Sequence, residues 1–198
     1  MDASMKKPLI TPTAELVKEA CREFDDQNDL TENALDQLFK LFPENTVPSQ
    51  VLLKVAALNQ LYSTQILAVS EVAKHICANG SELDLALKSG VTTIVDRIAK
   101  VTIKEKVRNN FSFASKYCSW HQPDLFPIWD SRVDWYLRRL QRETKFCSSF
   151  GSADHWDYPA FHSVMVCLRT TYNLEAFTFK QIDKFLYKYG ELATVSEA

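Results

Sequence analysis

Glycine is scarce in this sequence, with only 4 residues in 198. Glycine supplies the positive φ angles of tight hairpin turns and the close backbone approach of phosphate-binding loops. Its shortage argues against a β protein with many hairpins and against a glycine-rich nucleotide loop. No apolar run approaches the roughly 20 residues of a membrane span, and residues 1–12 are too polar for a secretory leader. We therefore expect a soluble, cytoplasmic chain that makes no membrane contact.

The sequence also lacks a cysteine pattern. Its five cysteines are odd in number and form no Cys-x-x-Cys pair, and its four histidines do not combine with them at the spacing of metal ligands. In a reducing compartment such thiols stay free and behave as small apolar side chains. We therefore expect free thiols, no metal site and no cofactor.

What the sequence does contain is an ordinary globular composition with an uneven charge. The hydrophobic share of 46% and the charged share of 24% favour one folded domain over a disordered chain. Residues 1–91 carry 8 Lys/Arg against 13 Asp/Glu, residues 92–145 carry 11 against 6, and residues 146–198 carry 4 against 6. The basic middle third could meet nucleic-acid phosphates, although a solvated set of helix faces would give the same counts.

Apolar residues recur at helical spacing along almost the whole chain, and no alternating strand pattern of useful length is present. The predicted fold class is all-α: a compact multi-helix single domain over residues 13–198, preceded by a flexible tail at 1–12. Thr13 and Thr31 are expected helix starts, and the acidic residues 25–29 are an expected turn between them. The helices predicted beyond these cover residues 49–78, 81–87, 92–101, 107–121, 131–142, 158–172 and 178–189.

The most specific stretch runs from Ser112 to Leu140. It reads as a helix, a proline-bounded loop, Asp130, and a second amphipathic helix that begins at Ser131. An aspartate in this place is a natural N-cap. Its neighbours are unusually aromatic, and a carboxylate beside so much apolar surface tends to have a shifted pKa. These neighbours are Trp120, Phe126, Trp129 and Trp135.

Two segments in this order resemble the helix-hairpin-helix (HhH-GPD) DNA glycosylase superfamily. Residues 128–133, Ile-Trp-Asp-Ser-Arg-Val, are similar to the short pattern that carries the family's catalytic aspartate. Upstream, residues 61–65, Leu-Tyr-Ser-Thr-Gln, are similar to the family's early helix, which approaches the DNA strand. The likeness is strongest over residues 50–140, and its layout is closest to the archaeal 8-oxoguanine DNA glycosylases. The stretches SFASK and PIWDS and the terminal helix also resemble uncharacterised bacterial proteins.

The resemblance implies a protein that removes a modified or damaged base from DNA. Asp130 would stabilise the positive charge that builds on the sugar and orient the attacking water. The side chains expected to form the base pocket or the wedge are Tyr62, Gln65, Trp120, His121 and Trp129, although aromatic residues at these spacings are more often plain core. The side chains expected on the DNA backbone are Lys104, Lys106, Arg108, Asn110, Lys116 and Arg132.

The sequence departs from the family at its hairpin. Residues 102–110 contain no glycine, so phosphate contacts would rely on side chains. The place of the Schiff-base lysine of bifunctional members falls at residues 109–111, which hold no lysine. The sequence therefore predicts a monofunctional, water-using glycosylase. Two other hypotheses stay open: a DNA-binding relative without catalysis, and a helical protein–protein interaction module.

Overall fold

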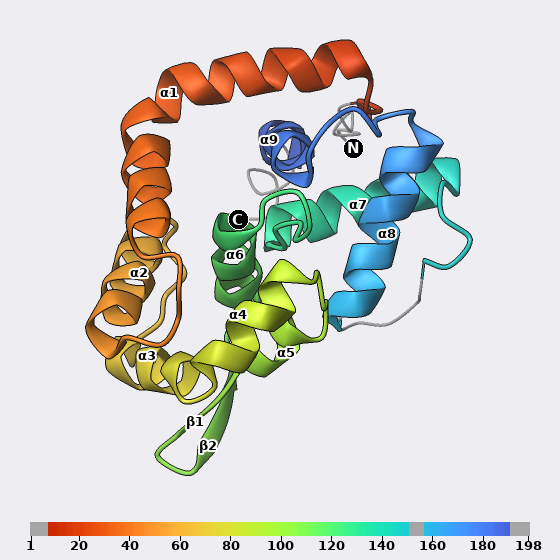
Figure 1. Cartoon of the computed structure of the whole chain (residues 1–198). Helices are drawn as coiled ribbons and strands as arrows, with labels where there is room; N and C mark the ends of the chain where they lie inside the picture. The colour runs from red at the N-terminus through yellow and green to blue at the C-terminus, as the bar shows by residue number, and fades with distance from the viewer. Residues whose placement is uncertain (1–7, 151–156, 191–198) are drawn as a thin grey trace, which may run out of the picture.

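The computed structural model describes residues 8–150 and 157–190 and is mostly helical (Figure 1). Nine helices and one two-stranded antiparallel hairpin occur within these described ranges. In chain order they are α1 (Ala14–Leu41), α2 (Pro48–Leu61), α3 (Val69–Cys77), α4 (Gly80–Lys88), α5 (Ile94–Ala99), β1 (Lys100–Ile103), β2 (Lys106–Asn109), α6 (Phe111–His121), α7 (Ser131–Thr144), α8 (Tyr158–Thr171) and α9 (Phe179–Gly190). The coarse prediction of an all-α chain is confirmed.

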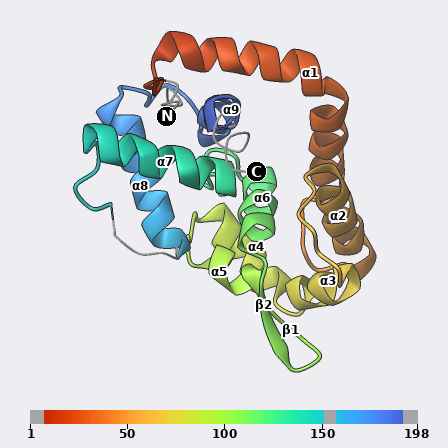
Figure 2. The same cartoon turned by 180° about the vertical axis from the view of Figure 1, so that it is seen from behind.

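Helix α1 begins where the sequence predicted, with Thr13 as its N-cap. The predicted turn at residues 25–29 and the predicted cap at Thr31 are wrong, because α1 continues through both to Leu41. The helix bends sharply instead of breaking (Figures 1 and 2). Near the bend, the side-chain amide of Asn28 donates to the carbonyl of Phe24 at 2.9 Å. A side chain that competes for the helical carbonyls in this way favours curvature.

Helix α9 lies in the angle of the bent α1 (Figures 1 and 2). Ion pairs join the two helices: Lys184 contacts Asp25, and Lys188 Nζ lies 3.1 Å from Glu19 Oε1 and 2.9 Å from Glu23 Oε2. The other face of α9 packs its apolar residues against α7 and the core. Helix α9 therefore packs against both α1, at the start of the described chain, and α7.

The long helix predicted over residues 49–78 is wrong, because a loop separates α2 from α3. The loop contains Ser63 and Gln65 with φ angles of 49° and 59°. Asn59 holds it: its Oδ1 accepts from the Ile66 backbone N–H at 2.8 Å, and its Nδ2 donates to the Ile66 carbonyl at 3.0 Å. An asparagine side chain that replaces helical backbone partners gives the chain an alternative to a continued helix.

Gly80 begins α4, one residue before the start of the helix predicted over 81–87. The reason for a glycine is packing. A Cβ on Gly80 would lie 2.3 Å from the carbonyl oxygen of Asn45, a distance that real Cβ atoms do not show. The absence of a side chain therefore lets α4 pack directly on the loop between α1 and α2.

A β-hairpin stands where the sequence predicted helix and no strands. β1 and β2 pair in antiparallel register, with Lys100 opposite Asn109, and the hairpin projects from the helical body (Figures 1 and 2). Its turn is made by Lys104 and Glu105, with φ angles of 47° and 64°. The helix predicted over 107–121 therefore begins only at Phe111. Without glycine in the turn, the sequence lacked the usual hairpin signal.

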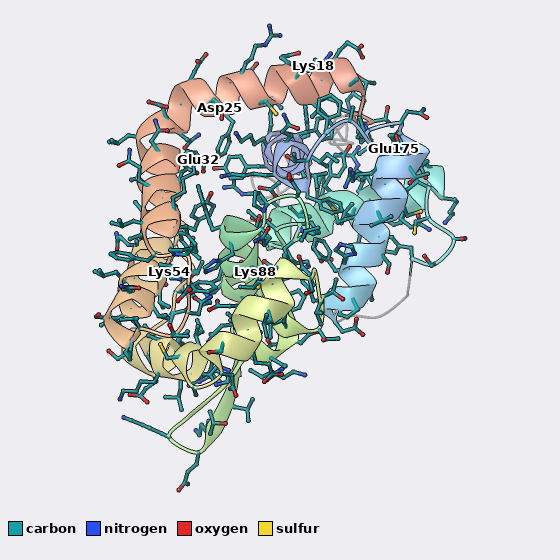
Figure 3. The ribbon with its side chains drawn as sticks, in the orientation of Figure 1. Lys18, Asp25, Glu32, Lys54, Lys88 and Glu175 are labelled. Carbon is teal, nitrogen blue, oxygen red and sulfur yellow. The ribbon has the colours of Figure 1, made fainter. Side chains whose placement is uncertain are left out.

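Side chains fill the space between the ribbons (Figure 3), and one hydrophobic core extends through the described helices. The described part of the expected tail, residues 8–12, packs on this core: Tyr136 donates its hydroxyl to the Ile10 carbonyl at 2.6 Å. All five cysteines are free thiols. Among the described residues, no helix is both long enough and apolar enough to cross a membrane.

Candidate functional site

Asp130 is the N-cap of α7, as its position before Ser131 predicted. Its Oδ1 accepts the backbone N–H groups of Arg132 and Val133, each at 3.0 Å. These two bonds leave the second oxygen, Oδ2, free to face the protein interior, where it lies 3.7 Å from Nζ of Lys116. The helix terminus therefore fixes the carboxylate and presents one oxygen to other groups.

Lys116 projects from α6 into the protein, and only 6% of its side chain is exposed. Its ammonium donates to Ser112 Oγ at 2.8 Å, one turn earlier on the same helix. Burial lowers the pKa of Lys116, while the charge of Asp130 acts in the opposite direction. The pair thus combines a buried cation with a carboxylate whose orientation is fixed.

Ser115 joins α6 to the loop that carries Asp130. Its buried hydroxyl oxygen accepts the backbone N–H of Trp129 at 3.0 Å and lies 3.1 Å from the Trp129 carbonyl. The indole of Trp129 packs edge-on against Phe111, with ring centroids 5.2 Å apart. These contacts hold the residue before Asp130 against α6, and they explain why Lys116 and Asp130 meet.

Asp183, on α9, completes the site and was missed by the sequence analysis. Burial and the neighbouring Asp130 raise the pKa of Asp183 to about 8, with Lys116 and Lys180 acting in the opposite direction and Glu32 adding to the rise. The cluster holds three carboxyl groups and two lysines. It is therefore electrically neutral only when one carboxyl group carries a proton, and Asp183 is the group that keeps it.

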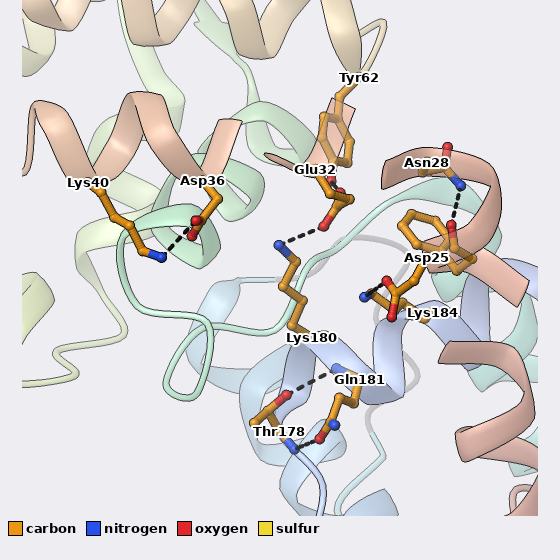
Figure 4. Close-up of polar contacts among 11 residues, drawn as sticks. Asp25, Asn28, Glu32, Asp36, Lys40, Tyr62, Thr178, Lys180, Gln181 and Lys184 are labelled. Atoms are coloured by element: carbon orange, nitrogen blue, oxygen red, sulfur yellow. Dashed lines mark hydrogen bonds and ion pairs between the residues drawn. The ribbon is translucent and has the colours of Figure 1, made fainter. Parts of the chain in front are cut away.

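Glu32 connects the rim of this cluster (Figure 4). It accepts the Tyr62 hydroxyl at 2.9 Å through one oxygen and pairs with Lys180 Nζ at 2.8 Å through the other. Lys180 Nζ also lies 3.4 Å from the centroid of the Trp120 ring, a cation–π arrangement. Burial and Glu32 raise the pKa of Tyr62 far above its usual range, so this hydroxyl stays a donor. The ammonium of Lys180 covers one face of an indole beside the buried carboxyl groups.

A separate buried network surrounds Lys54 of α2. Its Nζ donates to the carbonyls of Phe42 and Glu44 at 3.0 and 2.9 Å and to Asn45 Oδ1 at 2.8 Å. Nε2 of His121 also lies 3.2 Å away, so the three N–H groups of the ammonium are shared among four acceptors. Burial, with the charge of Lys54, lowers the pKa of His121 well below its ordinary value. This network ties α2, α6 and the loop after α1 together.

The structure brings together some of the predicted pocket residues. Tyr62 and Trp120 lie on the rim of the Asp130 cluster, with ring centroids 6.3 Å apart. His121 belongs instead to the Lys54 network. Trp129 packs against α6, and its buried indole N–H has no hydrogen-bond acceptor among the described residues. Gln65 is exposed in the loop between α2 and α3.

The side chains predicted on the DNA backbone fall into two groups. Three are exposed on the projecting hairpin: Lys104, Lys106 and Arg108. The other three are partly or fully buried. Asn110 precedes α6, Lys116 lies beside Asp130, and the guanidinium of Arg132 lies 4.6 Å from the Tyr187 ring centroid. The buried position of Lys116 makes it a member of the site and leaves the hairpin as the accessible basic surface.

The sequence held one signal for Asp183. It lies four residues after Phe179 and three before Leu186, both buried, so it falls on the apolar stripe of α9. A charged residue in that stripe needs a partner. No local pattern indicates which distant groups, Asp130 and Lys116 among them, would meet it.

Comparison with known proteins gives two matches. A family model described as the HI_0787_N N-terminal domain matches residues 16–125, more than half of the chain. An uncharacterised protein from Haemophilus influenzae is 36% identical over 148 residues, which cover 75% of this chain and 70% of that protein. No solved structure matches. The family match includes α6 and Lys116 and stops before Asp130. The chain therefore belongs to the HI_0787_N family.

Proposed function

We propose that the protein removes a modified or damaged base from DNA, as a monofunctional glycosylase of the helix-hairpin-helix type. The observation that carries this proposal is the pairing of Asp130 with Lys116, at 3.7 Å, beside the aromatic rings of Tyr62 and Trp120. Glycosidic cleavage needs a fixed carboxylate next to a surface on which a base can stack. In chain order, α5, the β-hairpin and α6 precede Asp130.

In this proposal each charged group has one task. Asp130 stabilises the positive charge that develops on the sugar and orients a water molecule for attack. Asp183 keeps a proton near neutral pH and supplies it to the departing base. Lys116 holds the carboxylate of Asp130 in place. Its role is that of a positioning cation, because the adjacent Asp130 carboxylate opposes the effect of burial, which lowers the pKa of Lys116.

The direct experiment uses oligonucleotide duplexes that each carry one modified base, incubated with the protein and then treated with alkali to cleave abasic sites. The informative variant is Asp130→Asn, because asparagine is as good an N-cap as aspartate and should leave α7 intact. Asp157→Asn is the matched control, since Asp157 caps α8 through Ala160 in the same way. We expect base release by the wild type and the control and none by Asp130→Asn.

A borohydride trap in the same reactions separates water attack from amine attack. Water attack leaves no covalent adduct between protein and DNA, and this is the expected result. An adduct that disappears with Lys116→Gln would make Lys116 the nucleophile and the protein a bifunctional enzyme.

One observation favours a second function, a DNA-binding relative without catalysis. The Lys180 ammonium lies over the Trp120 ring, where a stacked base would need to lie. Salt-sensitive DNA binding without release of any base would support this second function. Absence of any DNA binding would leave the helical interaction module, and Leu67, which is 99% exposed, would be the first residue to test for a contact.

A further inference from the structure

The β1–β2 hairpin is basic and is exposed over most of its length. Every residue of β2 is exposed, including Val107, whose exposure is 68%. The turn and β2 together carry three cations, with Glu105 as the single acid between them. The base of the hairpin packs against the core through Val101, and its turn projects from the helical body (Figures 1 and 2). A surface hairpin with no partner of its own gains nothing in stability from an exposed valine, so this composition suggests a contact surface.

The strand register separates the two faces of the hairpin, because paired residues lie on the same face. One face carries Val101, which is buried, and Ile103, which is half-buried, and these two side chains pack against the core, whereas their partners on this face, Arg108 and Lys106, are exposed. The opposite face is exposed along both strands. Its members are Lys100, Thr102, Val107 and Asn109. The hairpin therefore has an inner anchoring face and an outer face with hydrogen-bonding groups and methyl groups.

We propose that this hairpin enters the major groove of duplex DNA. A two-stranded ribbon fits a major groove about 12 Å wide and 8.5 Å deep. Four residues per strand give each strand a length of about 13 Å. Thr102 and Asn109 can hydrogen-bond to base edges and Val107 can contact a thymine methyl, while the cations at the turn and on β2 contact phosphates.

This inference rests on the proposed function for its DNA substrate, but it assigns recognition to a surface remote from the chemistry. In this proposal the side chains of the hairpin, rather than its backbone amides, contact the DNA phosphates. A hairpin without glycine can therefore still bind DNA. Lysines on an exposed strand also prevent pairing with other strands. That role needs charge alone and predicts no dependence of DNA affinity on these particular positions.

The test measures duplex binding by fluorescence anisotropy over a series of salt concentrations, with Asp130→Asn as the common background so that base release is not required. The variant removes Lys104, Lys106 and Arg108 together by alanine substitution. The matched control removes three exposed lysines elsewhere, Lys18, Lys40 and Lys88, and changes the net charge equally. Each lost phosphate contact lowers the salt-dependence slope by about 0.9, so we expect a fall of about 2.7 for the hairpin variant and little for the control.

Dimethyl sulfate footprinting then identifies the groove, because the reagent methylates guanine N7 in the major groove and adenine N3 in the minor groove. We expect protection of guanine N7 by the background protein and loss of that protection in the hairpin variant. An unchanged salt slope, or protection confined to adenine N3, would overturn the proposal. A footprint at N7 without any base release by the wild type would remove the proposed function and leave the hairpin inference standing.

Discussion

Replacing Asp183 with asparagine should stabilise the protein, and increasingly so as the pH rises. The pKa of Asp183 is raised to about 8 in the fold, by burial and by Asp130, whereas an aspartate in an unfolded chain has a pKa of about 3.9. Between these values the folded state binds a proton that the unfolded state has released. The free energy of unfolding therefore falls with rising pH, by at most about 1.4 kcal/mol per pH unit for one such group.

Asp183→Asn removes this loss. Because Asp183 is partly exposed and solvent screening reduces the effect, we expect the variant to exceed the wild type by about 1–3 kcal/mol at pH 7.5, with a smaller difference at pH 5. Urea unfolding at several pH values measures both proteins. The lowered pKa of His121 reduces the free energy of unfolding below about pH 6.5 in the wild type and in Asp183→Asn alike. This contribution therefore cancels when the two proteins are compared.

Asp124→Asn is the matched control. The Asp124 carboxyl group is exposed in the loop after α6, and its substitution is the same change of aspartate to asparagine. A difference between wild type and Asp183→Asn that stays constant from pH 5 to 7.5 would refute the reasoning. Such a result would mean that Asp183 is ionised throughout and that its neighbours already compensate its charge.

Three further outcomes are expected. Gly80→Ala should destabilise the protein by about 1–3 kcal/mol in urea unfolding, because the added Cβ meets a backbone carbonyl. Ser81→Ala, on the same helix, should have no such effect. Equal urea midpoints for the two variants would contradict the close packing at Gly80. Lys54→Met should cost about 2 kcal/mol or more, because the carbonyls of Phe42 and Glu44 lose this donor and Asn45 Oδ1 keeps only the Tyr117 hydroxyl. A loss under about 1 kcal/mol would show that the carbonyls find other donors. The rate of base release should fall as the pH rises through about 8 and this limb should vanish in Asp183→Asn; an unchanged profile would exclude Asp183 as the proton donor.

Local chemistry decided which features were predictable. Thr13 and Asp130 cap helices because their side chains bond to N–H groups two or three residues away, and such short-range bonds are visible in sequence. The helix break held by Asn59 was not visible, because asparagine is also common inside helices when tertiary packing compensates. The hairpin turn at Lys104 and Glu105 adopts positive φ without glycine and so carried no usual signal.

The site was only half predictable for a related reason. Asp130, Tyr62 and Trp120 belong to segments with recognisable patterns, and Lys116 links Asp130 to the Tyr62 ring, which packs against Trp120. Asp183 and its partners come together through the packing of α9 against α1 and α7, over separations that no local pattern encodes. A charged residue on an apolar stripe indicates that a buried partner exists, and only the fold identifies it.

The most direct measurement of the proposed chemistry is base release under single-turnover conditions by the wild type, Asp130→Asn and Asp157→Asn, with urea midpoints measured for all three. Base release by the wild type and Asp157→Asn, and none by an equally stable Asp130→Asn, is the result that we expect. Equal base release by Asp130→Asn, or none by the wild type on any modified base, would contradict a glycosylase whose chemistry depends on Asp130.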